Sequence, residues 1–568
     1  MPSTIDLNML ADVLLAVMRY LEPALTAILL LRCGIPLLSF RKEPEVWGWL
    51  IHEDGSRESL KHWENVIGRN RHCDVWLDYP TVSRNHAVMT RYDDGSWTIT
   101  DTDSKGGVLV NGRPVSIRAL RTADRINIGG VELTFEPISP QQAKVLFGRR
   151  PKATGPTGSL LNLLLLTIFQ TLTCLSYLLR GDSGNTTHYL MAFGGLAIME
   201  WVLFLIYLCI RKAAFEVETL AFFLCTMGMS AICTVVPAEV IKQLVAMILG
   251  IFTFLLVGWS LRNLERAKVI RYLAAVGGVA LLAITLVLGK EINGAKNWLI
   301  FWGYSFQPSE MAKICFVYVG ASTMDRLMHR RNIILFITYT VMLCGFLALM
   351  NDFGTALIFF FAFLLIAYMR SGSMGTLALA CTALGFAGVI GVKLAPHAMR
   401  RFATWRHIWE DPFGAGYQQT RALICIASGG LFGIGVGRGK MKHIFAADSD
   451  MVFATISEEW GLLMGVFCIL AIVILALFAV RCAYVSRSSL YAIASCTAAG
   501  ILLVQTIFNA LGTVDILPLT GVNFPFVSNG GSGMMGMWGL LAFIKAGDTR
   551  RNASFAVNPI RFRRDEDA

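Results

Sequence analysis

The chain has 568 residues and a formal net charge of +11; 55% of its residues are hydrophobic and only 16% are charged. A mean hydropathy of +0.56 excludes an ordinary soluble enzyme and indicates a polytopic membrane protein. None of the 13 cysteines forms a CxxC pair, so the sequence indicates neither a disulfide framework nor a zinc site. We expect the thiols to pack as small apolar groups.

Runs of about 20 apolar residues, the length needed to cross a bilayer, recur along most of the chain. No Lys or Arg precedes the first run and no cleavage site stands out after it, so we expect an anchor and not a signal peptide. The thirteen expected crossings lie near residues 9 to 32, 158 to 180, 189 to 210, 218 to 236, 240 to 260, 269 to 289, 308 to 325, 332 to 350, 353 to 369, 374 to 394, 452 to 480, 488 to 512 and 530 to 547.

Basic residues beside alternate loops predict the orientation in the membrane. They gather on one side, the expected cytoplasm, which places the N-terminus outside and the C-terminus inside. The outer stretch from 395 to 451 breaks this rule because it holds seven Lys and Arg residues. A phosphate-bearing ligand is one physical reason for them. Binding of anionic lipid headgroups is the alternative.

Residues 45 to 137, between the first two crossings, differ from the rest of the chain in their pattern of hydrophobic and polar residues. Short alternating runs separated by Gly, Asp and Asn predict the strands of an all-β sandwich on the cytoplasmic side. The stretches "IGRNRHCDVWLDYPTVSRNHAVMT" and "DTDSKGGVLVNG" contain, in order, a Gly-Arg pair, a Ser-Arg-x-His motif and an Asn-Gly turn. Through these motifs the insert resembles the forkhead-associated (FHA) domain, which binds phosphothreonine.

A guanidinium, a hydroxyl and loop amides are the groups that a phosphate dianion requires. The resemblance implies that His86 braces the phosphate-binding loop and that Gly106 replaces the family's Asn. An FHA fold that packs against a partner without reading phosphate is the alternative. The implied phosphopeptide-binding residues are Arg69, Ser83, Arg84 and Asn111, the last of which forms a turn with Gly112.

From about residue 218 onward the chain resembles the SEDS family (shape, elongation, division and sporulation), the peptidoglycan glycosyltransferases of the RodA and FtsW type. The family has ten crossings with both ends inside, and residues 218 to 547 supply ten; three further crossings precede them. The motifs that carry the resemblance are "GAKNWLIFWGYSFQPSEMAKI", "NDFGTALIFF", "DPFGAGYQQTRALICIASGGLFGIGVGRG", "DSDMVFATISEEWG" and "LPLTGVNFPFVSNGGSGMM".

The resemblance implies polymerisation of lipid II, in which a sugar 4-hydroxyl attacks the anomeric carbon of a glycan carried on undecaprenyl diphosphate. An alcohol needs a base to take its proton, whereas a diphosphate leaves unprotonated if cations stabilise its charge. One carboxylate and a cationic rim therefore suffice. Glycoside hydrolysis, in contrast, uses a pair of acids.

Asp450 is the expected base because it matches the acid of the family's His-Thr-Asp-Phe motif. It stands at the border of an apolar run, where desolvation and the neighbouring Asp448 should raise its pKa. Asp448 replaces the family's His and is an alternative base, and a helix N-cap is the alternative role of Asp450. For Glu458 and Glu459, inside the run, we expect a structural role.

Further candidates for contacts to substrate come from the other motifs and from the basic outer stretch. Glu310 and Lys313 share a helix face, so a simple ion pair is the alternative; Asp352 could instead cap a helix. Asn297 replaces the family's Arg, so Lys296 is expected to supply any phosphate contact there. The full set is Lys296, Glu310, Lys313, Asp352, Arg400, Arg401, Arg421, Arg438 and Ser528.

Two further features concern the membrane region. The run from 421 to 435 is too short to cross and is expected to be re-entrant or interfacial. Glu200 lies in mid-crossing outside the resemblance. It is either a functional acid or a hydrogen-bond partner of a neighbouring helix.

Together these inferences predict a processive lipid II polymerase of the bacterial plasma membrane that acts in cell shape, division or sporulation. Phosphothreonine binding would regulate or localise it; a lipid II flippase and a non-catalytic recruiter are the alternatives. No cofactor follows from the sequence, which leaves a divalent cation, Mg²⁺ or Mn²⁺, open, and no metal site is expected. The implied partners are lipid II, undecaprenyl-diphosphate-linked glycan, a class B penicillin-binding protein and a phosphothreonine protein made by a Ser/Thr kinase, without nucleic acid.

The expected domain boundaries follow the same reading of the chain. They are 1–40 for the N-terminal anchor, 45–137 for the FHA domain, 138–157 for a basic linker, 158–212 for two additional crossings, 218–547 for the SEDS core and 548–568 for a charged cytoplasmic tail.

Overall fold

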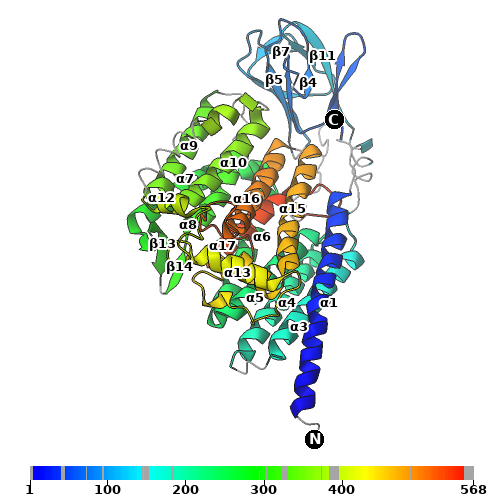
Figure 1. Ribbon diagram of the computed structural model, residues 1–568. Coiled ribbons are helices and arrows are strands. Elements are labelled where there is room, and N and C mark those ends of the chain that lie inside the picture. The colour runs from blue at the N-terminus through cyan, green and yellow to red at the C-terminus, as the bar shows by residue number, and fades with distance from the viewer. Residues whose placement is uncertain are drawn as a thin grey trace.

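Long apolar helices form a body, and a β domain sits at one end of it (Figure 1). The fold class expected from the sequence, a polytopic helical membrane protein with an all-β domain, is confirmed. The computed structural model describes residues 4–39, 45–71, 73–92, 95–139, 141–142, 145, 153–180, 184–292, 294–301, 303–322, 330–371, 374–375, 377–382, 385, 396–486 and 488–554.

Apolar segments of crossing length fold as helices because a helix pairs every backbone N–H and C=O internally. In the described part of the chain, nine helices are long and apolar enough to cross a membrane. The expected crossing at 374 to 394 lies largely outside the described residues. The helices of the body are α1 (Thr4–Leu38), α3 (Pro156–Leu178), α4 (Thr186–Cys209), α5 (Glu216–Val235), α6 (Val240–Leu261), α7 (Leu264–Leu288), α8 (Pro308–Ser322), α9 (Arg330–Leu349), α10 (Phe353–Ser371), α15 (Leu462–Tyr484), α16 (Ser489–Thr513) and α17 (Gly531–Gly547).

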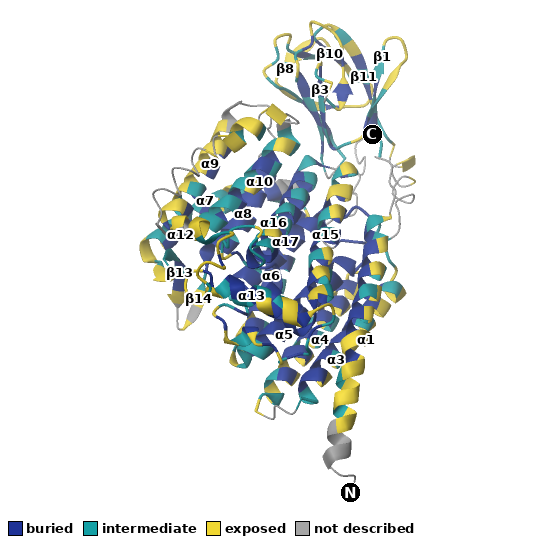
Figure 2. Cartoon of the chain, viewed as in Figure 1, coloured by how far each residue is buried: buried dark blue, intermediate teal, exposed yellow. Residues whose placement is uncertain are grey.

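Helix α5 lies at the centre of the body, and 94% of the residues in its apolar window are buried (Figure 2). Its Glu218 accepts a hydrogen bond from Lys545 of α17 at 2.9 Å, and both side chains are fully buried. Such a pair is tolerated in an apolar interior because each charge compensates the hydration that the other has lost. The central helix is thus tied to the last helix by a buried charge pair.

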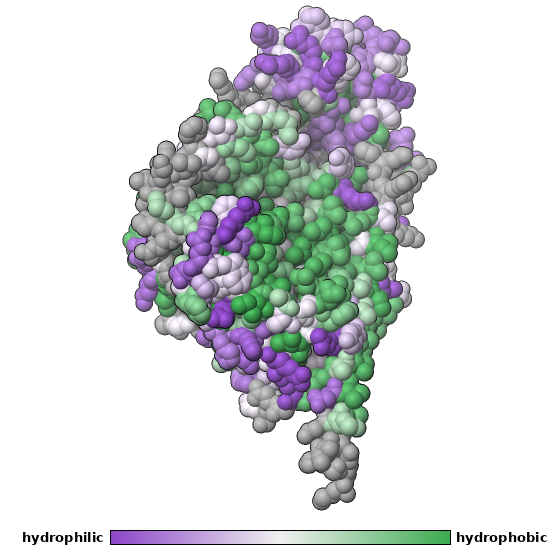
Figure 3. Space-filling view, viewed as in Figure 1, coloured by the Kyte–Doolittle hydropathy of each residue, from purple (hydrophilic) through white to green (hydrophobic). Residues whose placement is uncertain are grey.

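On the face shown in Figure 3, the described surface is mostly hydrophobic over the helical body and mostly hydrophilic over the β domain. Exposed apolar residues follow the outward faces of α1, α4, α6 and α7. A soluble protein rarely exposes apolar surface on this scale. The chain is therefore a multi-pass membrane protein whose β domain stands in water.

One expected crossing is divided in two. The run from 452 to 480 forms a short helix, α14 (Val452–Glu459), and then α15, with Gly461 between them at a φ of +90°. Helix α13 (Tyr417–Gly429) falls in the expected interfacial run and, with 13 residues, is too short to cross. The remaining helical segments are α12 (Pro396–Thr404), η1 (Pro237–Glu239) and η3 (Met441–His443).

The β domain is a sandwich of two sheets whose strands alternate buried and less buried residues. One sheet has the order β2-β1-β11-β10-β7-β8 and the other β4-β3-β5-β6-β9. The strands are β1 (Gly48–His52), β2 (Arg57–Leu60), β3 (Glu64–Gly68), β4 (Val75–Trp76), β5 (Ala87–Arg91), β6 (Trp97–Asp101), β7 (Val108–Val110), β8 (Arg113–Val115), β9 (Ile117–Leu120), β10 (Arg125–Ile128) and β11 (Val131–Pro137).

The β domain contacts the helical body at the turn between α15 and α16. Glu64 accepts a hydrogen bond from the hydroxyl of Ser488 at 3.1 Å and another from Ser489. His62 donates from Nδ1 to the carbonyl of Ser486 at 3.2 Å. These contacts are polar, as expected at the aqueous end of a membrane protein.

A small sheet at the opposite end of the body was not expected from the sequence. Its order is β12-β13-β14, formed by β12 (Lys290–Ile292), β13 (Ala295–Phe301) and β14 (Tyr304–Phe306). With α13, it lies on the side of the body away from the β domain (Figure 1).

Candidate functional site

A cavity of about 520 Å³ opens among β13, α8, α10, α12, α16 and the loops that precede α14 and α17. It brings together six residues singled out from the sequence, although they lie up to 140 positions apart: Glu310, Lys313, Asp352, Arg401, Asp448 and Asp450. Several polar residues that the sequence did not single out also line it, namely Asn297, Gln307, Ser449, Gln505, Thr520, Asn523 and Asn529.

The backbone that carries Asp450 is held unusually firmly. Each carbonyl from Ala447 to Asp450 accepts a hydrogen bond from another part of the chain. The donors to the four successive carbonyls are Thr455 Oγ1 (2.7 Å), the Asn529 N–H (2.8 Å), Ser528 Oγ (2.7 Å) and Asn509 Nδ2 (3.0 Å). A side chain on so restrained a backbone has few directions open to it, which is the preorganisation that catalysis needs.

Asp450 faces Arg401 across the Cα of Gly521. A Cβ built on Gly521, whose φ is +67°, would lie 3.3 Å from Asp450 Oδ2 and 3.7 Å from both terminal nitrogens of Arg401. Among the described residues, none donates a hydrogen bond to the Asp450 carboxylate, which leaves its lone pairs directed at the cavity. A larger residue than glycine would fill this space.

Burial raises the pKa of Asp450, the Arg401 guanidinium opposes that shift and the nearby Asp448 carboxylate adds to it. Asp448 itself accepts a hydrogen bond from Asn529 Nδ2 at 2.7 Å. Of the two aspartates, Asp450 therefore has the carboxylate that is better placed to accept a proton from a ligand.

Deeper in the cavity lies a buried ion pair. Lys313 Nζ is 2.7 Å from Glu310 Oε1, and both side chains are almost fully buried. The two carboxylate oxygens of Asp352 have different partners. Oδ1 accepts a hydrogen bond from the Thr355 N–H at 3.2 Å and so caps α10, whereas Oδ2 accepts one from Asn297 Nδ2 at 2.9 Å. Glu310 and Lys313 thus form the ion pair, and Asp352 the helix cap, that the sequence analysis gave as alternatives. All three residues nevertheless line the cavity.

Several buried polar atoms of the wall have no partner within the described protein. They include both amide atoms of Gln505, Asn297 Oδ1, Glu310 Oε2 and Thr520 Oγ1. Buried polar groups in native proteins are normally paired, because an unpaired one costs about 1–3 kcal/mol. Five such atoms in the wall of one cavity offer hydrogen bonds to a ligand rich in hydroxyl or amide groups.

Other candidates lie away from this cavity. Lys296 Nζ donates to the carbonyls of Leu286 (2.8 Å) and Val287 (3.3 Å) at the end of α7. Neighbouring residues of a strand point to opposite sides, so Asn297 enters the cavity and Lys296 does not. The guanidinium of Arg421 lies over the ring of Tyr417, with 5.4 Å to its centroid.

Arg438 and Ser528 also do not line the cavity, and the side chain of Arg400 lies outside the described part of the structure. Arg438 is 3.7 Å from Asp12 of α1. The Ser528 hydroxyl links two backbone segments: it donates a hydrogen bond to the Ser449 carbonyl and accepts one from the Phe524 N–H at 2.8 Å. Its geometry is that of a positioning residue.

The carboxylates expected to be structural are engaged within the protein. Glu458 accepts from the N–H groups of Lys440 (2.9 Å) and Met441 (2.8 Å). Glu200 accepts from Thr167 and Gln170 of α3, each at 3.0 Å, which is the hydrogen bond to a neighbouring helix that the sequence left open. No group of three or more metal-ligating side chains occurs among the residues that the structure describes.

In the β domain, His86 joins the loops that carry the phosphate-binding candidates. It is buried, accepts from the Ser83 N–H at 3.0 Å through Nδ1 and donates from Nε2 to the Gly107 carbonyl at 2.9 Å. Ser83 Oγ accepts from the Lys105 N–H at 3.0 Å, and the Arg69 N–H donates to the Ser83 carbonyl at 3.0 Å. A half-buried hydroxyl is thereby held among exposed basic side chains.

Three exposed cations, Arg69, Arg84 and Lys105, belong to these loops. Asn111 and Gly112 have positive φ angles of 51° and 76° and form the turn between β7 and β8. The Asn111 amide donates to Asp124 at 2.8 Å and accepts from the Arg125 N–H at 2.9 Å. Asn111 is therefore occupied inside the domain.

Comparison with known proteins gives two family matches. A family model described as "Cell cycle protein", of FtsW, RodA and SpoVE, matches residues 223–552, and the FHA domain model matches residues 65–129. The peptidoglycan glycosyltransferase RodA of Mycobacterium tuberculosis is 26% identical over 322 residues, which cover 53% of this chain and 69% of that protein.

A second relative, from Thiomicrospira cyclica, is named "Probable peptidoglycan glycosyltransferase FtsW". It is 32% identical over 272 residues, which cover 45% of this chain and 69% of the relative. One solved structure is described as "Structural coordination of polymerization and crosslinking by a peptidoglycan synthase complex". A chain of it has a TM-score of 0.50 and 25% identity, and the match covers 58% of this chain and 96% of that one.

Two substitutions in the cavity wall should affect stability differently. Lys313→Met leaves the Glu310 carboxylate buried without a counter-charge and should lower the free energy of unfolding by about 3–5 kcal/mol. Gln505→Leu removes a buried amide that has no partner among the described residues and should leave the melting temperature equal to or above that of the wild type. Thermal unfolding of purified variants in one detergent measures both.

The double variant Glu310→Leu/Lys313→Met supplies the control for the ion pair. It removes both charges and should be less destabilised than Lys313→Met alone. A melting temperature of Gln505→Leu several degrees below the wild type would contradict the assignment of that amide to a ligand.

Proposed function

The chain belongs to the FtsW, RodA and SpoVE family of cell cycle proteins, and on that premise we propose that it is a glycosyltransferase that polymerises lipid II into glycan strands. The observation that carries the proposal is Asp450, a carboxylate on a backbone held by four hydrogen bonds, facing a guanidinium across a cavity with unpaired polar walls. A lipid II flippase is not favoured, because the curated relatives are named glycosyltransferases.

Asp450 would act as the general base. The 4-hydroxyl of the acceptor sugar transfers its proton to the carboxylate as its oxygen forms a bond to the anomeric carbon of the donor glycan. The bond from that carbon to the undecaprenyl diphosphate breaks, and the diphosphate leaves with the electron pair. Arg401, which shares the Gly521 gap with Asp450, is the described cation best placed to stabilise that charge.

The unpaired wall atoms would bind the rest of the substrate. Gln505 offers a hydrogen-bond donor and an acceptor, and Asn297 offers an acceptor through Oδ1, to the hydroxyl and amide groups of the disaccharide. Positioning by such contacts supplies much of the rate enhancement when two large substrates must meet. Ser528 and Asn509 would act indirectly by holding the backbone that carries Asp450.

The catalytic cavity and the β domain would face opposite sides of the membrane. The β12-β14 sheet beside the cavity and the β domain lie at opposite ends of the hydrophobic body (Figure 1). With the β domain and the C-terminus in the cytoplasm, as the basic residues indicate, the cavity lies outside, where glycan is assembled. The FHA domain would there recognise a phosphothreonine through Arg69, Ser83 and Arg84.

A partner that crosslinks the glycan follows from the same family. The similar solved structure concerns a complex that coordinates polymerisation and crosslinking. We propose that this chain works with a class B penicillin-binding protein in the membrane, and that a Ser/Thr kinase produces the phosphothreonine ligand of its FHA domain.

The polymerase activity is tested with purified protein and lipid II. Asp450→Asn should reduce glycan formation by about 10²–10⁴-fold, the usual contribution of a general base. Glu410→Gln, a change in the same outer stretch but away from the cavity, should retain activity. Wild-type levels of glycan from Asp450→Asn would contradict the assignment, and movement of labelled lipid II across liposomes without glycan would favour transport.

The rate should also depend on pH through Asp450, which must be ionised to act. Asp448→Asn removes a like charge, lowers the pKa of Asp450 and should move the acid limb of the profile to lower pH. Arg401→Gln removes the opposing charge, raises that pKa and should move the limb to higher pH. Initial rates at low ionic strength give the limbs, and coincident limbs in all three proteins would refute the role of Asp450.

Phosphothreonine recognition is tested with paired phosphorylated and unphosphorylated peptide arrays and the full chain in detergent. Arg69→Ala should weaken binding of the phosphorylated peptides about tenfold or more, as expected when a charged hydrogen bond is lost. Arg57→Ala, an exposed arginine on β2 of the same domain, serves as the control. Equal binding of both peptide forms by the wild type would instead support an FHA fold that does not read phosphate.

A further inference from the structure

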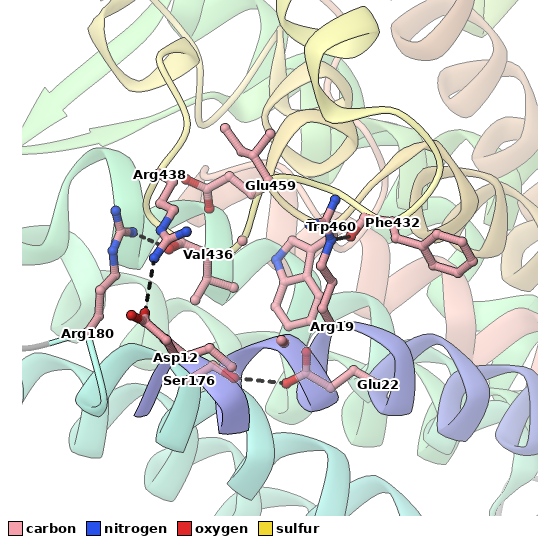
Figure 4. A pocket seen from close by; sticks show the side chains of 14 residues that line it. Asp12, Arg19, Glu22, Ser176, Arg180, Phe432, Val436, Arg438, Glu459 and Trp460 are labelled. Carbon is pink, nitrogen blue, oxygen red and sulfur yellow. Dashed lines mark hydrogen bonds and ion pairs between the residues drawn. The ribbon is translucent and has the colours of Figure 1, made fainter. Parts of the chain in front are cut away.

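Two arginines outside the family match grip the outer loop between α13 and η3 (Figure 4). Arg19 of α1 donates from Nε to the carbonyl of Phe432 at 3.1 Å. Arg180, two residues beyond the end of α3, donates from Nη1 to the carbonyl of Val436. Both acceptors are backbone carbonyls, so the two bonds fix the backbone of the loop and do not depend on the side chains of Phe432 or Val436.

The gripped loop leads directly into the catalytic segment. The Gly439 N–H donates to Glu459 at 3.2 Å, and the next two N–H groups donate to Glu458, which ties the loop to α14. Met441 then packs in an apolar cluster that also contains Ala447 and Met451, on either side of the aspartates. A shift at Val436 would therefore pass to the backbone around Asp450 through the bonds to Glu458 and Glu459 and through the Met441 cluster.

Helix α3 supports the same place by a second route. The Tyr177 hydroxyl is 2.9 Å from Thr234 Oγ1 of α5, and Thr234 donates to Glu459 Oε2 at 2.9 Å. Glu459 in turn holds the Gly439 N–H. Both routes from α3 converge on the stretch from 436 to 439.

The contact between α1 and the loop is sparse, so the hydrogen bonds of the two arginines matter more for holding the loop. A cavity of about 340 Å³ separates them, lined by Asp12, Glu22 and Arg438 among others (Figure 4). Apart from the ring contact of Tyr20 with Phe432, at 5.0 Å between centroids, little apolar packing bridges it. Arg19 also lies within the candidate span of α1.

The two gripping helices are the ones between which the FHA domain is inserted. Its strands run from Gly48 to Pro137, after α1 and before α3. Arg32 of α1 donates from Nε to Asn162 Oδ1 of α3 at 2.9 Å, so the pair is joined again nearer the β domain. The domain thus lies in the chain between the two helices whose arginines bond to the outer loop.

We infer that Arg19 and Arg180 are positioning residues for Asp450, and that through them α1 and α3 connect phosphopeptide binding on the FHA domain to the outer catalytic loop. The inference rests on the proposed polymerase function. Neither arginine touches the reacting atoms; both act by holding the loop at Phe432 and Val436.

Kinetics of the full chain in liposomes test the positioning role. The double variant Arg19→Gln/Arg180→Gln should lower kcat for glycan formation about tenfold to a hundredfold with little change in the KM for lipid II, the signature of a misplaced catalytic group. Arg19→Lys should retain part of the rate because its ammonium still donates. Arg32→Gln, which removes an arginine bond between α1 and α3 but none to the loop, should stay within twofold of the wild type.

A wild-type kcat in the double variant would overturn the positioning role. So would an equal loss in Arg32→Gln, since the effect would then reflect only the packing of α1 on α3.

A second arm tests the connection across the membrane. A saturating phosphothreonine peptide selected from the arrays should change kcat of the wild type severalfold and leave the double variant unchanged. An equal response of both proteins, or a wild type that does not respond, would overturn the connection while leaving the positioning role to the first arm.

A third arm separates this inference from the polymerase assignment because it needs no turnover. In an Asp450→Cys background, the rate of labelling by a membrane-impermeant maleimide should rise severalfold on adding Arg19→Gln/Arg180→Gln, after subtraction of the labelling of the parent chain. Unchanged labelling would overturn the inference. Absence of glycan from the wild type would instead refute the proposed function.

Discussion

The structure depends on one constraint: a carboxylate must remain partly desolvated at the border of a membrane and still point in one direction. Desolvation alone favours the neutral form and gives no orientation, so the backbone has to supply the direction. Four successive carbonyls from Ala447 to Asp450 are held by donors from α14, α16 and the segment that precedes α17. Because these donors come from elements far apart in sequence, the direction of Asp450 is a property of the assembled helical body. A local motif alone would not produce it.

The same physics separates structural polar groups from functional ones. In the described interior, acids that stabilise the fold are paired, as Glu218 is with Lys545 and Glu200 with residues of α3. In the cavity wall, by contrast, both amide atoms of Gln505 are buried and have no partner among the described residues. An apolar residue of similar shape would stabilise the fold at that position, so a buried, unpaired amide is retained for something that enters the cavity.

Much of this arrangement could be predicted from the sequence, but not the directions of side chains. Apolar runs predicted the crossings, alternation predicted the β sandwich, and the motif around Asp450 predicted an acid at the cavity. Lys296 was chosen over its neighbour Asn297 because its charge suited a phosphate, yet the unpredicted strand β13 turns Asn297 inward and Lys296 toward the end of α7. Arg438 was expected to contact substrate but lies away from the cavity for a similar reason: it pairs with Asp12, which is more than 400 residues away in the sequence. Composition reveals which groups are available, whereas tertiary packing decides which way they face.

The position of the β domain in the chain has a mechanical consequence. A domain fused to one terminus is tethered by a single segment and can swing without straining the membrane region. Here the domain is inserted between α1 and α3 and rests through Glu64 on the turn between α15 and α16. Helices transmit displacement along their axes far better than loops do, since every turn is hydrogen-bonded to the next. On the proposed coupling, a change of domain orientation at one face of the membrane is expected to reach the middle of α1 and the far end of α3, where Arg19 and Arg180 bond to the outer loop. On the proposed coupling, the insertion point gives the domain a mechanical role beyond that of an attached recruiting module.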